Sequence, residues 1–281
     1  MNSPVLSAAN PQTSAFNSDD LVLRVHDLSI DFGGLKALSG FSCELYHGEL
    51  VGLIGPNGAG KTTVFNMLSG IYTPTGGDIE FRDRRGSTHL VRGFSPAKLN
   101  HLGIARTFQN IRLFTKLSVE DNIRIALHSS RTSGPVDALF RLKRFRLDEE
   151  RMRAQALELL SLFKIQHKKD ELAMNLPYGE QRKLEIARAL ASNPSLLLLD
   201  EPAAGMNPQE TEDLMKIIGF IRDKFRLTIL LIEHDMRLVM GICRRLLVLD
   251  YGRTIAAGTP QEIRQNPAVI KAYLGTEAVD G

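Results

Sequence analysis

The chain has 281 residues, enough for one large domain or for a core with a subdomain. Hydrophobic residues make up 43% and charged residues 24%, as in an ordinary globular protein, and the net charge of +3 is too small to argue for nucleic-acid binding. No apolar run approaches the roughly 18 residues of a membrane span, and the only cysteines, Cys43 and Cys243, have no metal-site spacing and fit a reducing cytoplasm.

The N-terminal part predicts a tail followed by strands. Residues 1–20 have neither the basic start nor the continuous apolar stretch of a secretory signal, and we expect them to be disordered. The segment Leu21–Ile30 alternates like a strand, and the short apolar run Glu49–Gly55 predicts a buried strand. A helix is expected over Lys61–Ser69, ended by Gly70.

The segment "GPNGAGKTT" lies between that buried strand and that helix and fits the pattern G-x-x-x-x-G-K-[ST]. Its glycines let backbone N–H groups point at phosphate oxygens, and the helix N-terminus adds partial positive charge. Lys61 would reach the β- and γ-phosphates, and Thr62 would be a ligand of Mg²⁺. A glycine-rich turn that binds no nucleotide is the weaker alternative, and the absent G-x-G-x-x-G spacing disfavours a nicotinamide dehydrogenase. The predicted nucleotide-binding residues of this phosphate loop are Gly55, Pro56, Asn57, Gly58, Ala59, Gly60, Lys61, Thr62 and Thr63.

Residues 110–184 change character and predict a helical subdomain inserted in the core. Ser118–Asp121 has the capping-box pattern of a helix start. Residues 131–147 form a basic, loop-like segment, and residues 148–163 predict an amphipathic helix. The apolar face of that helix would carry Met152, Ala156, Leu159 and Phe163. After "LPYGE", another helix is expected to begin at Gln181.

Three apolar segments, "SLLLLD", "LTILLI" and "RLLVLD", then alternate with helices, which predicts an α/β core with a mostly parallel sheet. Asp200 and Glu201 follow the first of these strands at its C-terminal end, where ligands of open parallel sheets bind. Asp200 suits Mg²⁺, and Glu201 suits the general base that polarises the attacking water. His234 follows the next strand, where it is either structural or in contact with the γ-phosphate.

Together these segments resemble the ATP-binding subunits of ABC transporters, over nearly everything from Leu21 to Leu274. The resemblance implies a P-loop NTPase core of ABC type, with an antiparallel β subdomain and the inserted helical subdomain, in one domain spanning 21–275. It makes residues 55–63 the Walker A loop and "LLLLDEP" the Walker B strand, with ATP and Mg²⁺ as cofactors. Other roles that it implies are adenine stacking for Phe32, Mg²⁺ binding and catalysis for Gln109 in the Q-loop "RTFQN", and the switch histidine for His234; Asn207 stands where the D-loop usually has Asp.

The stretch "LPYGEQRKLEIARAL" resembles the signature sequence of the same family. In that family the signature helix of one subunit points at ATP held by the Walker A loop of another subunit. Pro177 takes the place of a serine whose hydroxyl and N–H would face the γ-phosphate. The residues that would contact the nucleotide of the second subunit are Leu176, Pro177, Tyr178, Gly179 and Glu180.

Three longer segments resemble one branch of the family, the LivG-like ATP-binding subunits of bacterial branched-chain amino-acid importers. The segments are "RTFQNIRLF", "EPAAGMNPQET" and "LLIEHDMRLVMGI". The branch implies a peripheral ATPase at the cytoplasmic face of the inner membrane. Its expected partners are two transmembrane permease subunits, a second ABC ATPase subunit in a hetero- or homodimer, and indirectly a periplasmic substrate-binding protein.

Two alternatives share these motifs. One is the ATPase of another ABC complex, for urea import or lipopolysaccharide extraction. The other is a soluble ABC ATPase that acts on nucleic acid, which the basic run Arg141–Arg146 favours. Nucleic-acid relatives carry long coiled-coil insertions or two ATPase halves in one chain, and this chain has neither. We therefore expect no nucleic-acid partner.

Overall fold

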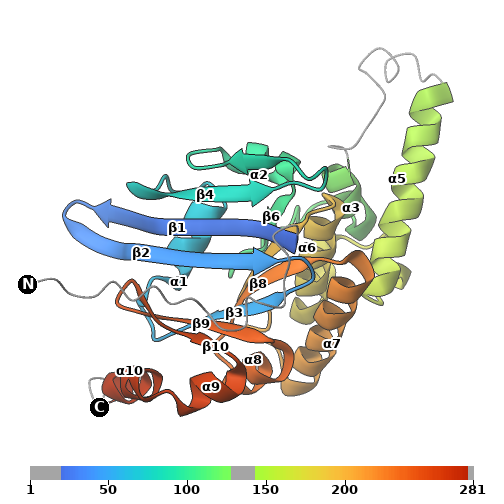
Figure 1. Ribbon diagram of the computed structural model, residues 1–281. Coiled ribbons are helices and arrows are strands. Elements are labelled where there is room, and N and C mark those ends of the chain that lie inside the picture. The colour runs from blue at the N-terminus through green and yellow to red at the C-terminus, as the bar shows by residue number, and fades with distance from the viewer. Residues whose placement is uncertain (1–19, 128–142, 278–281) are drawn as a thin grey trace, which may run out of the picture.

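The computed structural model describes residues 20–127 and 143–277 (Figure 1). The predicted tail therefore lies outside the described residues, apart from Asp20, and so does the part 131–142 of the predicted basic loop. The described residues form a six-stranded sheet, a four-stranded sheet and the helices that cover them.

The six-stranded sheet has the order β10-β9-β3-β8-β7-β6. Its neighbouring strands are parallel, except that β10 pairs with β9 in the antiparallel direction, which confirms the predicted mostly parallel core. The strands are β3 (Leu50–Ile54), β6 (Ile104–Arg106), β7 (Leu196–Asp200), β8 (Thr228–Ile232), β9 (Arg245–Asp250) and β10 (Arg253–Gly258).

Both faces of this sheet are covered, because every residue of β3, β7 and β8 is buried. Successive side chains of a strand point to opposite faces. Accordingly, Leu197 and Leu199 pack in one apolar cluster with helices α6, α7 and α8, while Leu196 and Leu198 pack in a second cluster with α1 and the smaller sheet. Continuous apolar runs are typical of such doubly covered strands, which explains the segments seen in the sequence.

The four-stranded sheet is antiparallel, with the order β2-β1-β4-β5, as expected for the β subdomain. Its first strand continues two residues beyond the predicted end at Ile30 and has several register shifts against β2. Figure 1 shows this sheet lying over one side of the core. The strands are β1 (Leu21–Phe32), β2 (Leu35–Tyr46), β4 (Gly76–Arg82) and β5 (Thr88–Leu90).

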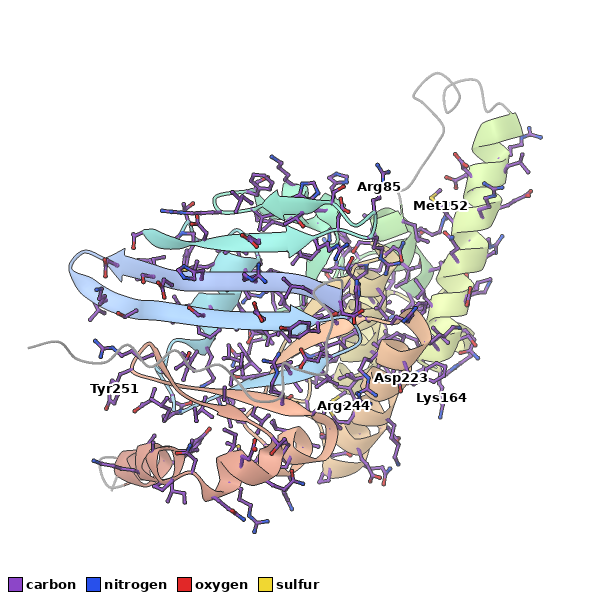
Figure 2. The ribbon with its side chains drawn as sticks, viewed as in Figure 1. Arg85, Met152, Lys164, Asp223, Arg244 and Tyr251 are labelled. Atoms are coloured by element: carbon purple, nitrogen blue, oxygen red, sulfur yellow. The ribbon has the colours of Figure 1, made fainter. Side chains whose placement is uncertain are left out.

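Between β6 and β7 the described residues form helices α3 (Val119–Leu127), α5 (Lys143–Leu162) and α6 (Tyr178–Ala191), with two short 3₁₀ turns. These helices share one apolar cluster with the core strands, and Figure 2 shows Met152 on the side of α5 that faces α3. Helix α6 continues without a break through residue 184, the predicted C-terminal limit of the helical subdomain, so the helix itself marks no boundary there. The limits 110–184 therefore stay a prediction.

Three details of this region differ from the sequence-based expectation. Helix α6 begins at Tyr178 and not at Gln181, because the carbonyl of Pro177 accepts the first helical bonds from Glu180 and Gln181. Residues 143–147 belong to α5 and not to a loop, since no glycine or proline lies between Pro135 and the end of α5 at Leu162. Leu160, rather than Leu159, completes the buried face of α5.

The remaining helices cover the sheets and the C-terminal edge. The predicted helix after the phosphate loop is confirmed to within one residue, with Ser69 as its C-cap. None of the described helices is long and apolar enough to cross a membrane. The helices are α1 (Lys61–Leu68), α2 (Pro96–Leu102), α7 (Pro208–Phe225), α8 (Met236–Ile242), α9 (Pro260–Gln265) and α10 (Pro267–Glu277).

Both cysteines lie in the apolar clusters, and burial raises the pKa of Cys43 and the pKa of Cys243 to about 12. Only the thiolate reacts with disulfide reagents, and at pH 8 a thiol of that pKa is ionised in about one molecule in ten thousand. We expect the folded protein to show almost no reaction with Ellman's reagent at pH 8, and both thiols to react after unfolding in guanidinium. Rapid modification of the folded protein would contradict the buried placement.

Candidate functional site

The phosphate loop connects β3 to α1 with glycines at the positions that need them. Gly58 and Gly60 have φ of 76° and 102°, in the left-handed region that glycine adopts without strain. At Gly55 a Cβ would lie 2.0 Å from the carbonyl oxygen of Leu249, so any side chain there would collide with the backbone of β9. Gly60 precedes α1 without a side-chain cap, which leaves the first N–H groups of the helix available to a phosphate.

Lys61 bends back over this loop. Its Nζ donates hydrogen bonds to the carbonyl oxygens of Gly55 at 2.7 Å and of Pro56 at 2.8 Å. Burial lowers the pKa of Lys61, and the nearby carboxylates of Glu201 and Asp200 act in the opposite direction. The ammonium group is therefore held beside two acidic side chains, where it can bind the phosphate of a nucleotide.

Strand pairing brings the acidic pair next to the loop. In the parallel register Leu53 of β3 lies opposite Ile232 of β8, and Ile232 lies opposite Asp200 of β7. The phosphate loop, Glu201 and His234 thus follow the same row of three neighbouring strands. Residues 57–63, Glu201 and His234 line a hollow of about 210 Å³.

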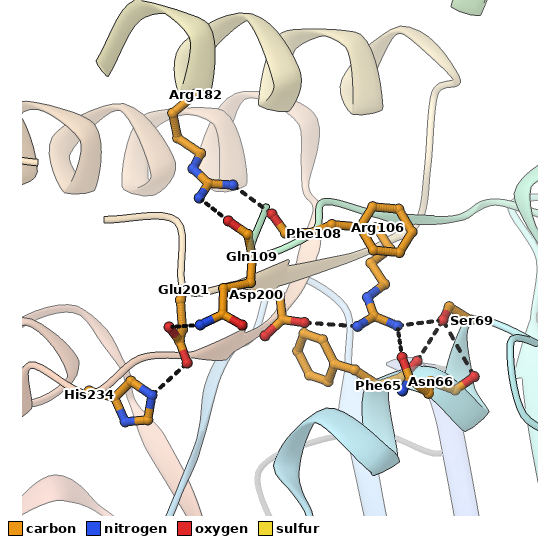
Figure 3. A network of polar contacts seen from close by, with 10 residues as sticks. All are labelled: Phe65, Asn66, Ser69, Arg106, Phe108, Gln109, Arg182, Asp200, Glu201 and His234. Carbon is orange, nitrogen blue, oxygen red and sulfur yellow. Dashed lines mark hydrogen bonds and ion pairs between the residues drawn. The ribbon is translucent and has the colours of Figure 1, made fainter. Parts of the chain in front are cut away.

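Glu201 is held on both carboxylate oxygens (Figure 3). Its Oε2 accepts a hydrogen bond from Nε2 of Gln109 at 2.9 Å, and its Oε1 lies 2.5 Å from Nε2 of His234. The backbone of Glu201 has φ of 47°, an uncommon conformation for a residue with a side chain, and such conformations cluster at functional sites. Three of the four side chains predicted to be catalytic therefore meet at one point, although Glu201, Gln109 and His234 come from separate segments; the fourth is Lys61.

The neighbouring Glu233 links the segments that follow β7 and β8. Burial raises the pKa of Glu233, and its carboxylate accepts hydrogen bonds from the backbone N–H groups of Ala203 and His234. Asp235 caps α8 by accepting from the N–H of Arg237 at 2.8 Å. These contacts fix the backbone on both sides of His234.

Asp200 is nearly fully buried and forms an ion pair with Arg106 of β6, with Oδ2 at 2.8 Å from Nη2. Burial raises the pKa of Asp200, and the guanidinium of Arg106 opposes that rise. Its other oxygen, Oδ1, accepts no hydrogen bond from any described residue and is available to a cation.

The donor set suits Mg²⁺. A carboxylate oxygen, the Thr62 hydroxyl at the start of α1 and the amide oxygen of Gln109 are hard oxygen ligands of the kind that this ion prefers. Within the described residues no group of three or more His, Cys, Asp or Glu side chains could hold a metal ion by itself. Mg²⁺ is commonly bound through one or two protein ligands together with the phosphates of a nucleotide.

Phe32 lies at the end of β1, where it is 43% exposed and makes an edge contact with Tyr72, with ring centroids 5.2 Å apart. The exposed ring can therefore accept an adenine face while Tyr72 holds it from the side.

The signature residues lie at the start of α6. Leu176 is buried in the core, and its carbonyl oxygen accepts a hydrogen bond from Nε2 of Gln181 at 2.8 Å, while Tyr178 is 44% exposed. The Tyr178 ring packs beside Gly205 and its hydroxyl accepts a hydrogen bond from Arg182. Glu180 pairs with Lys168 at 2.6 Å. Pro177 offers no side-chain cap, which leaves this helix N-terminus with free N–H groups.

Sequence reasoning missed Arg106 and Arg182. Arg182 is fully buried and donates to the carbonyl oxygens of Phe108 and Gln109 at 2.6 Å each, which ties α6 to the Q-loop (Figure 3). The only local signal for Arg106 is an arginine that ends the short apolar segment "GIAR" three residues before Gln109.

A family model for ABC transporters matches residues 38–204, more than half of the chain, including the phosphate loop and the acidic pair. The chain belongs to the family of ABC transporter ATP-binding proteins. A second model, for branched-chain amino acid ATP-binding cassette transporters, matches residues 253–279 of this ABC protein, in its C-terminal strand and helices.

This ABC protein is 46% identical to the high-affinity branched-chain amino acid transport ATP-binding protein LivG of Escherichia coli K12, over 90% of this chain and 98% of LivG. It is 36% identical to the lipopolysaccharide export system ATP-binding protein LptB of the same organism, over 91% and 98%. Its fold is similar to the crystal structure of the ADP conformation of an ATP-binding cassette of an ABC transporter, with a TM-score of 0.77, 31% identity and coverage of 91% and 99%. The expected ABC-type fold is confirmed.

The exposed ring of Phe32 generates a prediction for nucleotide binding. Base–aromatic stacking contributes roughly 1–3 kcal/mol in nucleic-acid complexes, so Phe32→Ala should raise the dissociation constant for ATP by about tenfold. Calorimetry in EDTA, which prevents turnover, measures the change. Leu35→Ala, an exposed apolar truncation in the same turn, is the control and should leave affinity unchanged. Equal affinity of Phe32→Ala and the unaltered protein would remove Phe32 from adenine binding.

Proposed function

We propose that this chain is the ATP-hydrolysing subunit of a bacterial ABC importer that energises branched-chain amino-acid uptake. The observation that carries the ATPase proposal is the convergence of the phosphate loop, Asp200 and the Gln109–Glu201–His234 contacts at one edge of the parallel sheet. Membership of the ABC family and the likeness to LivG over nearly the whole chain support the same activity.

The mechanism follows from where charge must be neutralised. The loop N–H groups and Lys61 bind the phosphates, and the oxygens of Thr62, Asp200 and Gln109 would hold Mg²⁺. Mg²⁺, when bound, neutralises charge that develops on the phosphate oxygens. Glu201 orients the attacking water and accepts its proton, while His234 leaves Glu201 to contact the γ-phosphate.

The N-terminus of α6 supports a role for a second ATPase subunit. Its uncapped N–H groups and the helix dipole favour a phosphate group there, while Gly179 is packed against Glu210 and Met206 of this same chain. In this proposal Leu176 to Glu180 contact ATP bound by the partner, and two ATPase subunits close around two nucleotides.

The importer assignment rests on the relatives. LivG is 46% and BraF of Pseudomonas aeruginosa 43% identical to this chain, against 36% for LptB, and the C-terminal segment matches the branched-chain model. These values favour amino-acid uptake over lipopolysaccharide export. The complex then contains two transmembrane permease subunits, receives leucine, isoleucine or valine from a periplasmic binding protein, and holds this chain peripherally at the cytoplasmic face of the inner membrane.

The catalytic proposal predicts the behaviour of Glu201→Gln. The amide keeps the size of the side chain but cannot accept a proton, so ATP should still bind while hydrolysis falls by about 10²–10⁴-fold, the usual range for a lost general base. Phosphate release by the assembled complex measures the rate. Glu212→Gln, on the exposed face of α7, is the matched control and should hydrolyse ATP normally. A Glu201→Gln complex with near-normal turnover would exclude Glu201 as the base.

The transport proposal predicts which proteins accompany the chain. Affinity purification from detergent-solubilised membranes, followed by mass spectrometry, should recover branched-chain amino-acid permease subunits and a second ATP-binding subunit. The chain without permease subunits should show little binding to neutral liposomes. Recovery of a lipopolysaccharide-export or urea-import complex in their place would overturn the cargo assignment but not the ATPase assignment.

A further inference from the structure

Arg106 joins three parts of the nucleotide site through one buried guanidinium. Nη2 donates to Oδ2 of Asp200 at 2.8 Å, and Nη1 donates to Oδ1 of Asn66 at 2.7 Å and to Oγ of Ser69 at 2.8 Å (Figure 3). Asn66 and Ser69 lie at the far end of α1, the helix that begins with Lys61 and Thr62. Arg106 itself ends β6 and is the first residue of the Q-loop segment "RTFQN".

The surroundings hold this guanidinium in place. Only 5% of the Arg106 side chain and 4% of the Asp200 side chain are exposed. The group lies against the rings of Phe65 and Phe108, with centroid distances of 5.5 Å and 4.9 Å. A planar guanidinium fixed on several sides allows little rotation, and the Asp200 oxygen that it binds is fixed with it.

The consequence concerns the other oxygen of Asp200. A carboxylate is planar, so fixing Oδ2 also fixes the direction of Oδ1, which has no hydrogen-bond donor among the described residues. Partners that orient a ligating carboxylate typically change metal affinity by about 10–100-fold when they are removed.

We propose that Arg106 is a positioning residue for Mg²⁺: it orients Asp200 relative to Thr62 by linking Asp200 to the same helix that carries Thr62. The inference rests on the proposed role of Asp200 in Mg²⁺ binding. It adds a specific residue, the first of the Q-loop segment "RTFQN", on which the effect of Mg²⁺ depends although its side chain does not itself bind the ion.

A second buried ion pair provides the control. Arg245 binds Glu49 with Nε at 2.9 Å from Oε1 and Nη2 at 2.8 Å from Oε2, and the two side chains are 10% and 5% exposed, close to the burial of the Arg106–Asp200 pair. This pair lies at the opposite end of the parallel strands, because Glu49 precedes β3 and Arg245 begins β9, whereas Arg106 and Asp200 end their strands. Removing either arginine leaves a buried carboxylate without its cation, but only Arg106 touches the nucleotide site.

The test measures binding and not turnover. The dissociation constant of a nonhydrolysable ATP analogue is determined in EDTA and in Mg²⁺. The value in EDTA divided by the value in Mg²⁺ is called the Mg²⁺ ratio, and it is large when Mg²⁺ strengthens binding. Arg106→Met should lower the Mg²⁺ ratio about tenfold or more and leave binding in EDTA unchanged. Arg106→Lys, which keeps the positive charge but not the planar set of N–H donors, should give an intermediate Mg²⁺ ratio. Arg245→Met should lower the thermal midpoint and leave the Mg²⁺ ratio unchanged.

Asp200→Asn separates the two levels of the proposal. One outcome is that Asp200→Asn lowers the Mg²⁺ ratio to about one while folded Arg106→Met keeps the ratio within twofold of the unaltered protein. In that case the role of Arg106 is overturned and that of Asp200 stands. If Asp200→Asn leaves the ratio intact, the proposed role of Asp200 is wrong. If Arg245→Met lowers the ratio as much as Arg106→Met, the effect is one of general stability and the inference is also overturned. Should Arg106→Met fail to fold by circular dichroism, Arg106→Gln, which keeps a polar side chain without the charge, decides by the same criterion.

Discussion

The parallel pairing of β3 with β8 and of β8 with β7 is the constraint on which the site depends. It places Leu53, Ile232 and Asp200 in one row across the sheet. The phosphate loop begins two residues after Leu53, His234 follows two residues after Ile232, and Glu201 follows Asp200 directly. A register shift of one residue in either pairing would turn the alternating side chains of a strand to the wrong face and separate these groups.

Side-chain contacts connect to the site those residues that the strand register does not bring there. Gln109 comes from the segment after β6, at the edge of the sheet, and reaches Glu201 through one hydrogen bond. Arg182 holds the backbone of that segment from α6, and Arg106 connects its start to Asp200 and α1. The acidic pair is therefore connected to the signature helix through the Q-loop, so a displacement of α6 has a direct physical path to Glu201.

The sequence predicts the parts of this arrangement that local spacing determines. The phosphate loop needs glycine where φ is positive or space is absent, so its pattern is visible in nine consecutive residues. The buried strands are visible because both faces of the sheet are covered. Arg106 and Arg182 escape such reasoning, since the partners through which they reach the acidic pair and the Q-loop, Asp200 and Gln109, lie 94 and 73 residues away and a buried arginine has no periodic signature. The sequence predicts the start of α6 three residues late, because Tyr178 and Gly179 are weak helix formers. In the structure the Pro177 carbonyl begins the hydrogen-bonding pattern.

Arg182 binds the segment before α3 through main-chain carbonyls of Phe108 and Gln109 and not through their side chains. Every amino acid supplies the same carbonyl, so this connection survives any substitution at those two positions that preserves the backbone path. The demand falls entirely on the donor, because only arginine presents several N–H groups in one rigid plane. This contact therefore constrains the two partners unequally: it requires arginine on the helix, whereas the side chains of Phe108 and Gln109 are constrained instead by their own contacts with Arg106 and Glu201.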